Sequence, residues 1–276
     1  MRDLSGTTAL VTGASGGIGR AIARGLAEAG VNVAVSGRRQ DALAAAVDEL
    51  QGLGVRAAGL PADLTDLEQC ESLVGRAEEA VGPLDLLVNN AGIEHASAFE
   101  IQPADELTET INLNLLAPML TTRAVLPGML ERGRGHVVFI SSVAGKIGPP
   151  YQAAYGASKA GLVGFSQSLR TEYVDAPIGF SVICPGFVAG DGMYQRMVEE
   201  GFQSNRLMGS TTLEKVTAAM LRAIRNDVPE IVVNNPPMRP LLVLAQMAPR
   251  LNERMAPRVG LTKLFRRVAA SRGRLP

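Results

Sequence analysis

Apolar residues in the first 235 positions alternate between two patterns. Short runs rich in Val, Ile and Leu, bounded by Gly, Pro or Asn, alternate with longer Ala/Leu-rich segments of helical spacing. The short runs predict seven strands, at 7–13, 31–37, 55–61, 84–90, 136–142, 180–186 and 230–234. The longer segments predict helices near 18–29, 40–51, 66–81, 106–132, 152–174 and 212–225.

This alternation predicts an α/β fold with a doubly wound parallel sheet and helices on both faces, because each helix provides the crossover that parallel strands require. The sheet is expected to span residues 1–235 as one domain. Such sheets bind ligands at the carboxyl ends of their strands. Residues that directly follow the predicted strands are therefore the candidates for function.

Residues 236–276 differ from the rest and are interpreted as a C-terminal extension. They hold 9 basic and 1 acidic side chains, whereas residues 1–235 hold 18 basic and 26 acidic ones, and they contain six of the 16 prolines. Two interpretations are open. Short helices of the extension can fold back over the acidic core, covering the substrate entrance or an oligomer contact. Alternatively, their apolar and basic residues make a weak contact with a membrane surface.

The composition argues against several classes of protein. Zero formal net charge and 4% aromatic residues, without Trp, give neither a basic surface nor stacking platforms for nucleic acid. No apolar run reaches the roughly 18 residues of a spanning helix, and the first residues do not resemble a signal peptide. We therefore expect a cytoplasmic protein. The two cysteines match no metal-ligand spacing, and no metal site is assigned.

A glycine-rich turn, Gly13 to Gly19, joins the first predicted strand to the first helix. Glycines allow a tight turn, and the free N–H groups of a helix N-terminus bind a pyrophosphate. The alternative is a plain glycine turn, but the position inside a βαβ unit favours dinucleotide binding. The residues assigned to the cofactor here are Gly13, Ser15, Gly17, Ile18 and Gly19.

Two arginines, Arg38 and Arg39, follow the second strand, where NAD-binding units carry an acidic residue. A guanidinium without a nearby carboxylate binds a 2′-phosphate, so we expect NADP(H) rather than NAD(H); two solvated arginines are the alternative. Asp63, after the third strand, is assigned to the adenine; the alternative is that it helps to start the next helix, where Thr65 and Glu68 already form a capping-box pattern.

The fourth strand ends in Asn89-Asn90-Ala91-Gly92. An amide at a strand end can tie neighbouring strands together, and a small Ala-Gly step lets a ribose lie close. We assign Asn90 and Gly92 to the cofactor site. A purely structural role for the asparagines is the alternative.

Tyr155 and Lys159 are four residues apart in a predicted helix, so both side chains project from one face. A neighbouring ammonium lowers the pKa of a phenol, which makes Tyr155 a candidate proton donor or acceptor near neutral pH. Ser142, at the end of the fifth strand, can hydrogen-bond the same substrate oxygen.

In this order and spacing, the motifs resemble those of the short-chain dehydrogenase/reductase family over about residues 5–235. T-G-x-x-x-G-x-G matches Thr12 to Gly19, N-N-A-G matches Asn89 to Gly92, and Y-x-x-x-K matches Tyr155 to Lys159. The resemblance implies a Rossmann fold of seven strands. It also implies a homo-oligomer that pairs the helices at 106–132 and 152–174.

The resemblance further implies the catalytic roles. Tyr155 is the general acid/base, Lys159 lowers its pKa and holds the nicotinamide ribose, Ser142 positions the carbonyl, and Asn114 supports a water-linked proton relay. The residues expected beside the nicotinamide are Pro185, Gly186 and Val188. The family's usual threonine at position 190 is replaced by Gly190.

The implied activity is NADP(H)-dependent interconversion of an apolar ketone and a secondary alcohol. The expected pocket walls are apolar, namely Ile93, Val143, Ala144, Phe187, Met193 and Tyr151, while Glu94 and Asp191 could read a polar group. Three alternatives stay open: the same chemistry with NAD(H), a noncatalytic dinucleotide sensor or scaffold on this fold, and another nucleotide-fold enzyme such as a methyltransferase.

Overall fold

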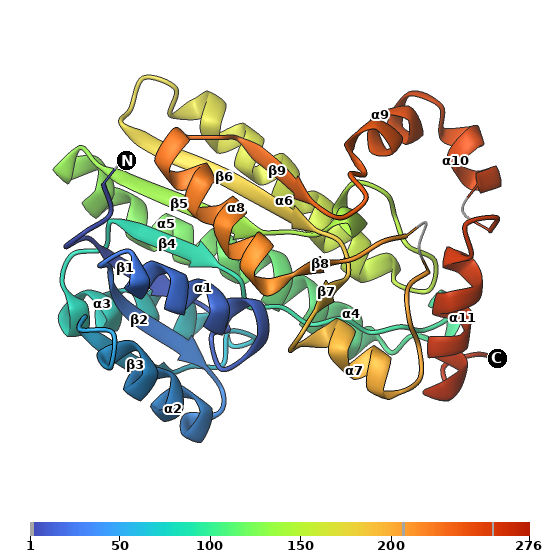
Figure 1. Ribbon diagram of the computed structural model, residues 1–276, viewed down its shortest axis with the longest axis horizontal. Helices are drawn as coiled ribbons and strands as arrows, with labels where there is room; N and C mark the ends of the chain where they lie inside the picture. Colours follow the sequence, from blue (N-terminus) through green and yellow to red (C-terminus); the bar gives the residue numbers. More distant parts are fainter. Residues whose placement is uncertain (1–2, 206–207, 256) are drawn as a thin grey trace.

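A parallel sheet of seven strands runs through the centre of the protein (Figure 1). The computed structural model describes residues 3–205, 208–255 and 257–276. The strands are β1 (Thr8–Val11), β2 (Asn32–Gly37), β3 (Ala57–Pro61), β4 (Leu86–Asn89), β5 (Gly135–Ile140), β6 (Ile178–Pro185) and β9 (Glu230–Val233). Their order is β3-β2-β1-β4-β5-β6-β9, so the direction of winding reverses between β1 and β4. The predicted doubly wound sheet is confirmed.

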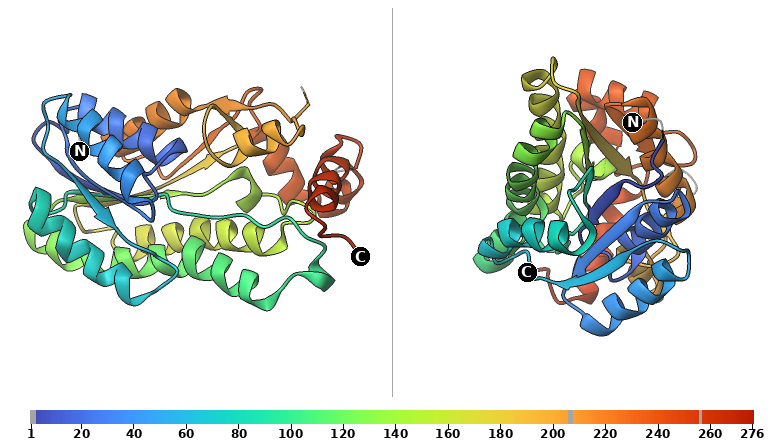
Figure 2. Two further views of the ribbon diagram at one scale, coloured as in Figure 1. Left: turned by 90° about the horizontal axis from the view of Figure 1, so that it is seen from below. Right: turned by 90° about the vertical axis from the view of Figure 1, so that its left-hand side faces the viewer.

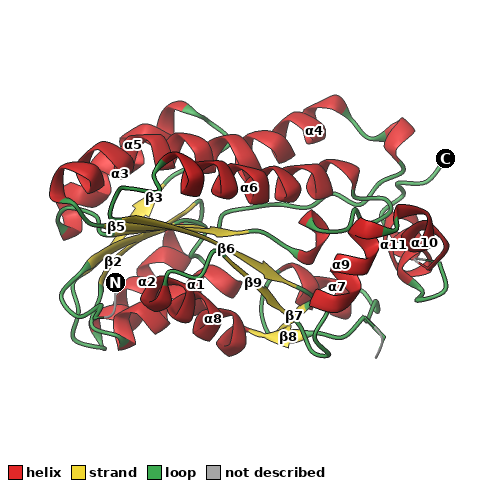
Figure 3. Ribbon diagram, turned by 90° about the horizontal axis from the view of Figure 1, so that it is seen from above, coloured by secondary structure: helices red, strands yellow, loops and turns green. Residues whose placement is uncertain are grey.

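Two layers of helices cover the sheet (Figure 3). The helices α1 (Gly17–Glu28), α2 (Gln40–Gln51) and α8 (Leu213–Asn226) lie on one face; α3 (Glu68–Val81), α4 (Ala104–Ile111), α5 (Ala117–Arg132) and α6 (Ala153–Glu172) lie on the other. Alternate strand residues supply the two cores: Val11 packs into the first, and Leu10 into the second. Nearly continuous apolar strands are the sequence signature of such a doubly covered sheet.

The helix predicted over 106–132 is confirmed as one continuous helical stretch from Ala104 to Arg132, but it contains a turn that the pattern did not predict. Between α4 and α5 the chain makes one turn of π-helix, Asn112–Leu116. Pro118 explains this turn in part, because it has no N–H to donate to the carbonyl of Asn114 and its ring crowds that carbonyl. Such π-helical turns are frequent at functional sites.

Segments that the pattern did not predict gather beyond the carboxyl ends of the strands. They are the short paired strands β7 (Val188–Ala189) and β8 (Thr211–Thr212) and the helix α7 (Met193–Glu199). The extension forms α9 (Arg239–Met247), α10 (Pro249–Met255) and α11 (Leu261–Ser271) at the same end of the molecule (Figures 1 and 2). A few residues of the predicted domain (1–2 and 206–207) and one of the predicted extension (256) lie outside the described residues.

Helix α11 is the part of the extension that packs into the body. One of its faces is buried in a third apolar cluster, where Leu264, Phe265 and Val268 meet Met197 of α7 and Ala96 of the segment after β4. The cluster therefore joins the C-terminus to two segments far away in the sequence. We call α7 with α9, α10 and α11 the cap.

Candidate functional site

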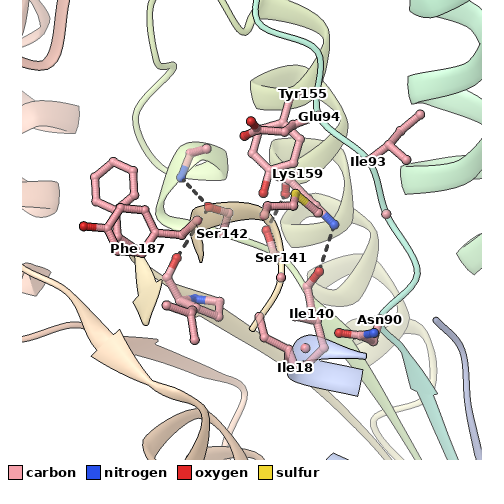
Figure 4. A pocket seen from close by; sticks show the side chains of 18 of the residues that line it. Ile18, Asn90, Ile93, Glu94, Ile140, Ser141, Ser142, Tyr155, Lys159 and Phe187 are labelled. Atoms are coloured by element: carbon pink, nitrogen blue, oxygen red, sulfur yellow. Dashed lines mark hydrogen bonds between the residues drawn. The ribbon is translucent and has the colours of Figure 1, made fainter. Parts of the chain in front are cut away.

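A cavity of about 840 Å³ lies at the carboxyl ends of the strands, beside the point where the strand order reverses (Figure 4). All the catalytic and cofactor residues assigned from the sequence line it, except Asn114. Motifs that are up to 175 positions apart along the chain, from Gly13 to Val188, thus share one space, because the parallel strands all end at the same edge.

The glycine-rich turn leaves no room for a side chain at Gly13 or Gly19. A Cβ atom on Gly19 would lie 2.4 Å from the carbonyl oxygen of Gly13, and one on Gly13 would lie 2.7 Å from the Cα of Ala91. The Asn90 amide holds this turn from the next strand, because its Nδ2 donates to the carbonyls of Thr12 (2.9 Å) and Gly13 (3.1 Å). The ends of β1 and β4 are tied together as the sequence predicts.

Both arginines after β2 line the cavity with exposed side chains, but their surroundings differ. The Arg39 guanidinium donates to the carbonyl oxygen of Ser15 (2.9 Å), so it is held against the glycine-rich turn. No hydrogen bond of the Arg38 side chain occurs among the described residues. Both cations therefore lie at the end of the cavity where an adenosine phosphate is expected, Arg39 fixed on the turn and Arg38 without a hydrogen-bond partner among the described residues.

Asp63 lines the cavity, but the capping-box pattern assigned to Thr65 and Glu68 is wrong. Helix α3 begins at Glu68, whose N–H is accepted by Asp66 (3.1 Å). Asp63 Oδ1 accepts hydrogen bonds from the backbone N–H (3.1 Å) and hydroxyl (2.8 Å) of Thr65. Its carboxylate thus holds the turn itself, which sequence spacing alone did not reveal.

The structure separates the two serines at the end of β5. The buried Ser141 hydroxyl donates to the carbonyl of Lys159 (2.8 Å) and so fastens α6 to the sheet. Ser142 accepts from the N–H of Ala144 (3.1 Å), donates a long hydrogen bond, 3.4 Å, to the carbonyl of Pro185, and is hydrogen-bonded with the Tyr155 phenol. Ser142 is therefore the serine whose hydroxyl is available in the cavity.

Tyr155 and Lys159 face the cavity from one side of α6, as their spacing predicts (Figure 4). Lys159 Nζ lies 5.9 Å from the centre of the Tyr155 ring and donates to the carbonyl of Ile140 (3.0 Å). Burial lowers the pKa of Lys159 to about 8.

The expected lowering of the Tyr155 pKa is wrong for this structure. Burial raises the pKa of the phenol, the nearby Glu94 raises it further, and a hydrogen bond with Ser142 only partly offsets both. Desolvation is the largest of these causes, because it penalises the phenolate directly. The phenol is consequently protonated at neutral pH.

Asn114 lies behind the cavity wall rather than in it. Its amide accepts from the N–H of Ile93 (2.8 Å), and donates to the Ile93 carbonyl (2.8 Å) and to the hydroxyl of Ser158 (3.1 Å). A Cβ atom on Gly92 would lie 3.1 Å from its Oδ1 and 3.3 Å from Lys159 Nζ. Asn114 thus joins the segment after β4 to α6 beside the lysine.

Near Tyr155 lies a buried hydrogen-bonded pair, Gln152 and Glu94, that the sequence analysis did not predict. Gln152 Nε2 donates to Glu94 Oε2 (2.7 Å), and Arg272 of the extension lies 3.8 Å from Oε1. The Glu94 side chain is only 13% exposed, and burial raises the pKa of its carboxyl. The sequence indicated Glu94 only as a residue at the rim of the pocket. Its hydrogen-bond and ion-pair partners come from distant segments, so the sequence did not indicate that it is buried.

Asp191 occupies the N-terminus of α1. Its Oδ2 accepts from the N–H of Gly17 (2.6 Å), one of the groups expected to bind a pyrophosphate. Gly190, in place of the family's threonine, has a φ of 120°, a conformation that side chains rarely adopt. The chain therefore brings a carboxylate to this point where a hydroxyl was expected.

The opposite end of the cavity is apolar, and the cap supplies much of its wall. Five of the expected wall residues line it, namely Ile93, Val143, Ala144, Phe187 and Met193. Tyr151 does not; it packs in the third apolar cluster instead. The sequence analysis did not identify the apolar cap residues Tyr194, Met197, Leu241, Leu244, Ala245, Leu261 and Phe265. The polar residues Gln195, Arg196 and Glu199 of α7 also line the cavity.

Comparison with known proteins is consistent with this site. Residues 7–200 match the family described as short chain dehydrogenase. The chain is 38% identical over 260 residues to the ketoacyl reductase HetN of Nostoc sp., covering 92% of this chain and 90% of that protein. It is 40% identical over 189 residues to the oxidoreductase UcpA of Salmonella typhimurium, covering 68% and 72%. A crystal structure of a short chain dehydrogenase/reductase from Burkholderia phymatum in complex with NAD aligns with a TM-score of 0.81 at 26% identity, covering 91% of this chain and 97% of that one.

Proposed function

Because the chain belongs to the short-chain dehydrogenase/reductase family, we propose that it is an NADP(H)-dependent oxidoreductase that interconverts an apolar ketone and a secondary alcohol. The observation that carries the proposal is the single cavity that Tyr155 and Ser142 share with the glycine-rich turn and an apolar wall. A proton donor, a nucleotide site and an apolar compartment in one space are what such a reaction requires.

The residues present fit a nicotinamide dinucleotide. The glycine-rich turn at Gly13 to Gly19 and the N-terminus of α1 would hold the pyrophosphate, and Asp63 the adenine. Lys159 would hold the nicotinamide ribose, beside Pro185, Gly186 and Val188. The exposed Arg38, with no carboxylate after β2, supports NADP(H) over NAD(H).

The protein's own groups then perform the proton chemistry. Ser142 donates a hydrogen bond to the ketone oxygen, and Tyr155 donates the proton that converts this oxygen to a hydroxyl. Lys159 supplies a positive charge beside the phenol while the proton leaves. When bound, the dinucleotide supplies the hydride for the carbonyl carbon.

The apolar cap wall supports an extended apolar substrate, such as a ketone on an acyl chain. Burying an unpaired charge in that wall would be costly, whereas methylene groups are stabilised there. The ketoacyl reductase named among the relatives is consistent with this substrate class.

The test is NADPH consumption with ketones of increasing chain length, measured as loss of nicotinamide absorbance, with NADH in parallel. We expect kcat/KM to rise with chain length and NADPH to be preferred. Equal use of NADH would favour the NAD(H) alternative. Nucleotide binding without turnover of any ketone would favour the noncatalytic sensor.

A further inference from the structure

Helix α9 presents an apolar face to solvent. Leu242 is buried, but Leu241, Val243, Leu244 and Met247 are 38%, 50%, 45% and 80% exposed. Among the described residues, these are four of the nine large apolar side chains that are exposed. Exposed apolar residues scattered singly are ordinary, but such a concentration on one short helix marks a contact surface.

This face is continuous with the cavity. Leu241 and Leu244 line the cavity and are also exposed, so they belong to both surfaces. Val243 and Met247 do not line it, although they lie on the same helix. The apolar end of the cavity therefore lies next to α9, the helix of the cap that has the most exposed apolar side chains.

The charges of the extension divide into two groups. Arg272 and Arg274 pair with carboxylates of the body, on Glu94, Glu200 and Glu106. The remaining seven cations are exposed and have no ion-pair partner among the described residues, against one exposed carboxylate, Glu253. They are Arg239, Arg250, Arg254, Arg258, Lys263, Arg266 and Arg267. The acidic body therefore neutralises only a small part of the excess charge.

Helix α11 shows how the two groups are arranged. Its buried face, with Leu264 and Val268, docks on the body, and its opposite face carries Lys263, Arg266 and Arg267. Helices α9 and α10 pack against each other at the same end of the molecule (Figures 1 and 3). Exposed apolar and cationic side chains thus gather around one end of the cavity.

We propose that this end of the cap docks on an anionic lipid surface, with the α9 side chains in the interface and the cations at the headgroups. Leu, Val and Met beside arginines are what interfacial binding requires, because area burial and attraction to anionic lipid add together. No helix in the described ranges is long and apolar enough to cross a bilayer, so the contact is peripheral.

The contact would place the open end of the cavity against the bilayer, from which an apolar ketone can enter. The entry of a ketone from the bilayer rests on the proposed function, whereas the docking on lipid does not. An acidic carrier protein is the competing occupant. The 80% exposed Met247 and the 50% exposed Val243 favour lipid, because they offer area to an apolar interface and nothing to a charged protein surface.

The test is sedimentation of the nucleotide-free protein with vesicles of phosphatidylcholine, with and without phosphatidylglycerol. We expect binding to the anionic vesicles that weakens with salt. Val243→Ser/Met247→Ser and Arg250→Glu/Arg254→Glu should each weaken it by on the order of tenfold or more. The matched controls are Leu53→Ser/Val174→Ser and Arg222→Glu/Arg225→Glu, which change exposed residues elsewhere and should bind as the wild type does.

Thermal unfolding of each variant, compared with the wild type, confirms that it is folded. No binding to anionic vesicles at low salt, or equal loss in the control pairs, would overturn the proposal. So would an acidic acyl-carrier protein that binds through Arg250 and Arg254 while vesicles do not. Vesicle binding by a protein that reduces no ketone would leave the docking standing and contradict only the proposed function.

Discussion

At the nucleotide end of the cavity the wall is backbone, whereas at the cap end it is side chain. Thr12, Gly13 and Asn90 lie at adjacent strand ends, where the Asn90 amide donates to the carbonyls of Thr12 (2.9 Å) and Gly13 (3.1 Å). At the cap end, Phe187 packs on Tyr194 and Phe265, with ring centres 4.9 Å and 6.3 Å apart. The first arrangement tolerates almost no substitution; the second can change shape by repacking.

This difference suggests a division of labour between the two ends. In the proposed function, the frame, which is the parallel sheet with α1 and α6, positions the cofactor and the proton donor, and the cap determines which ketone reaches them. Variants that affect one end and spare the other test the division.

The largest expected effect belongs to the frame. Tyr155→Phe should lower kcat about a thousandfold, because the transferable proton is lost while the ring remains. The dissociation constant for NADPH, from fluorescence titration, should hardly change. Tyr173→Phe, outside the cavity, is the control. A Tyr155→Phe enzyme with near-normal turnover would remove the tyrosine from the proposed mechanism.

Acid should destabilise the frame through His136, at the start of β5. Its Nε2 lies 2.8 Å from the Ser181 hydroxyl, and burial lowers the pKa of the imidazole to about 4. The unfolded chain takes up the proton near pH 6.5, so stability falls as the pH drops from about 6.5 to 4, by about 3 kcal/mol in total.

Urea unfolding at several pH values measures this loss. His136→Gln keeps a hydrogen-bond donor but cannot titrate, so its free energy of unfolding should fall less over the same range. Parallel curves for the two proteins would show that another group is responsible.

Arg38→Ala tests the adenosine part of the nucleotide end. We expect the affinity for NADPH to fall by roughly tenfold to a hundredfold and that for NADH to stay the same, because a charged hydrogen bond is worth about 1.5 to 3 kcal/mol. Arg39→Ala shows whether Arg39, whose guanidinium is hydrogen-bonded to Ser15, contributes to NADPH affinity as well as Arg38. Unchanged selectivity in both variants would contradict the proposed preference.

Arg272→Gln tests the cap. It removes the ion pairs with Glu94 (3.8 Å) and Glu200 (3.2 Å) that fasten the extension to the cavity wall. KM for a long-chain ketone should rise several-fold, with the NADPH dissociation constant unchanged. Arg123→Gln breaks an exposed pair with Glu71 and serves as the control. An equal loss of nucleotide affinity would mean that the two ends are not separable.

The smallest expected effect is a gain. Asp191→Asn removes a negative charge from the N-terminus of α1, where the cofactor's diphosphate must compete with it. NADPH should bind about two- to fivefold more tightly, measured by titration. Weaker binding would mean that the carboxylate helps to hold the cofactor, and Asp105→Asn controls for net charge.

The sequence by itself determined the frame. β-branched runs, helical spacing and a glycine turn act over a few residues, and so the seven strands and most helices follow from local pattern. The same is true of Tyr155 and Lys159, which one helix turn brings together. Local pattern missed the π-helical turn before Pro118, inside the helix predicted over 106–132, and wrongly assigned a capping box to Thr65 and Glu68.

Only the tertiary structure decided the surroundings of these groups. The pKa of Tyr155 is raised because burial and Glu94 both disfavour the phenolate, and neither can be read from the spacing of Tyr155 and Lys159. The cap forms because α11 packs on α7 and Arg272 reaches Glu94, contacts between residues far apart in the chain. Desolvation and long-range packing depend on what the whole fold brings together, so no local pattern encodes them.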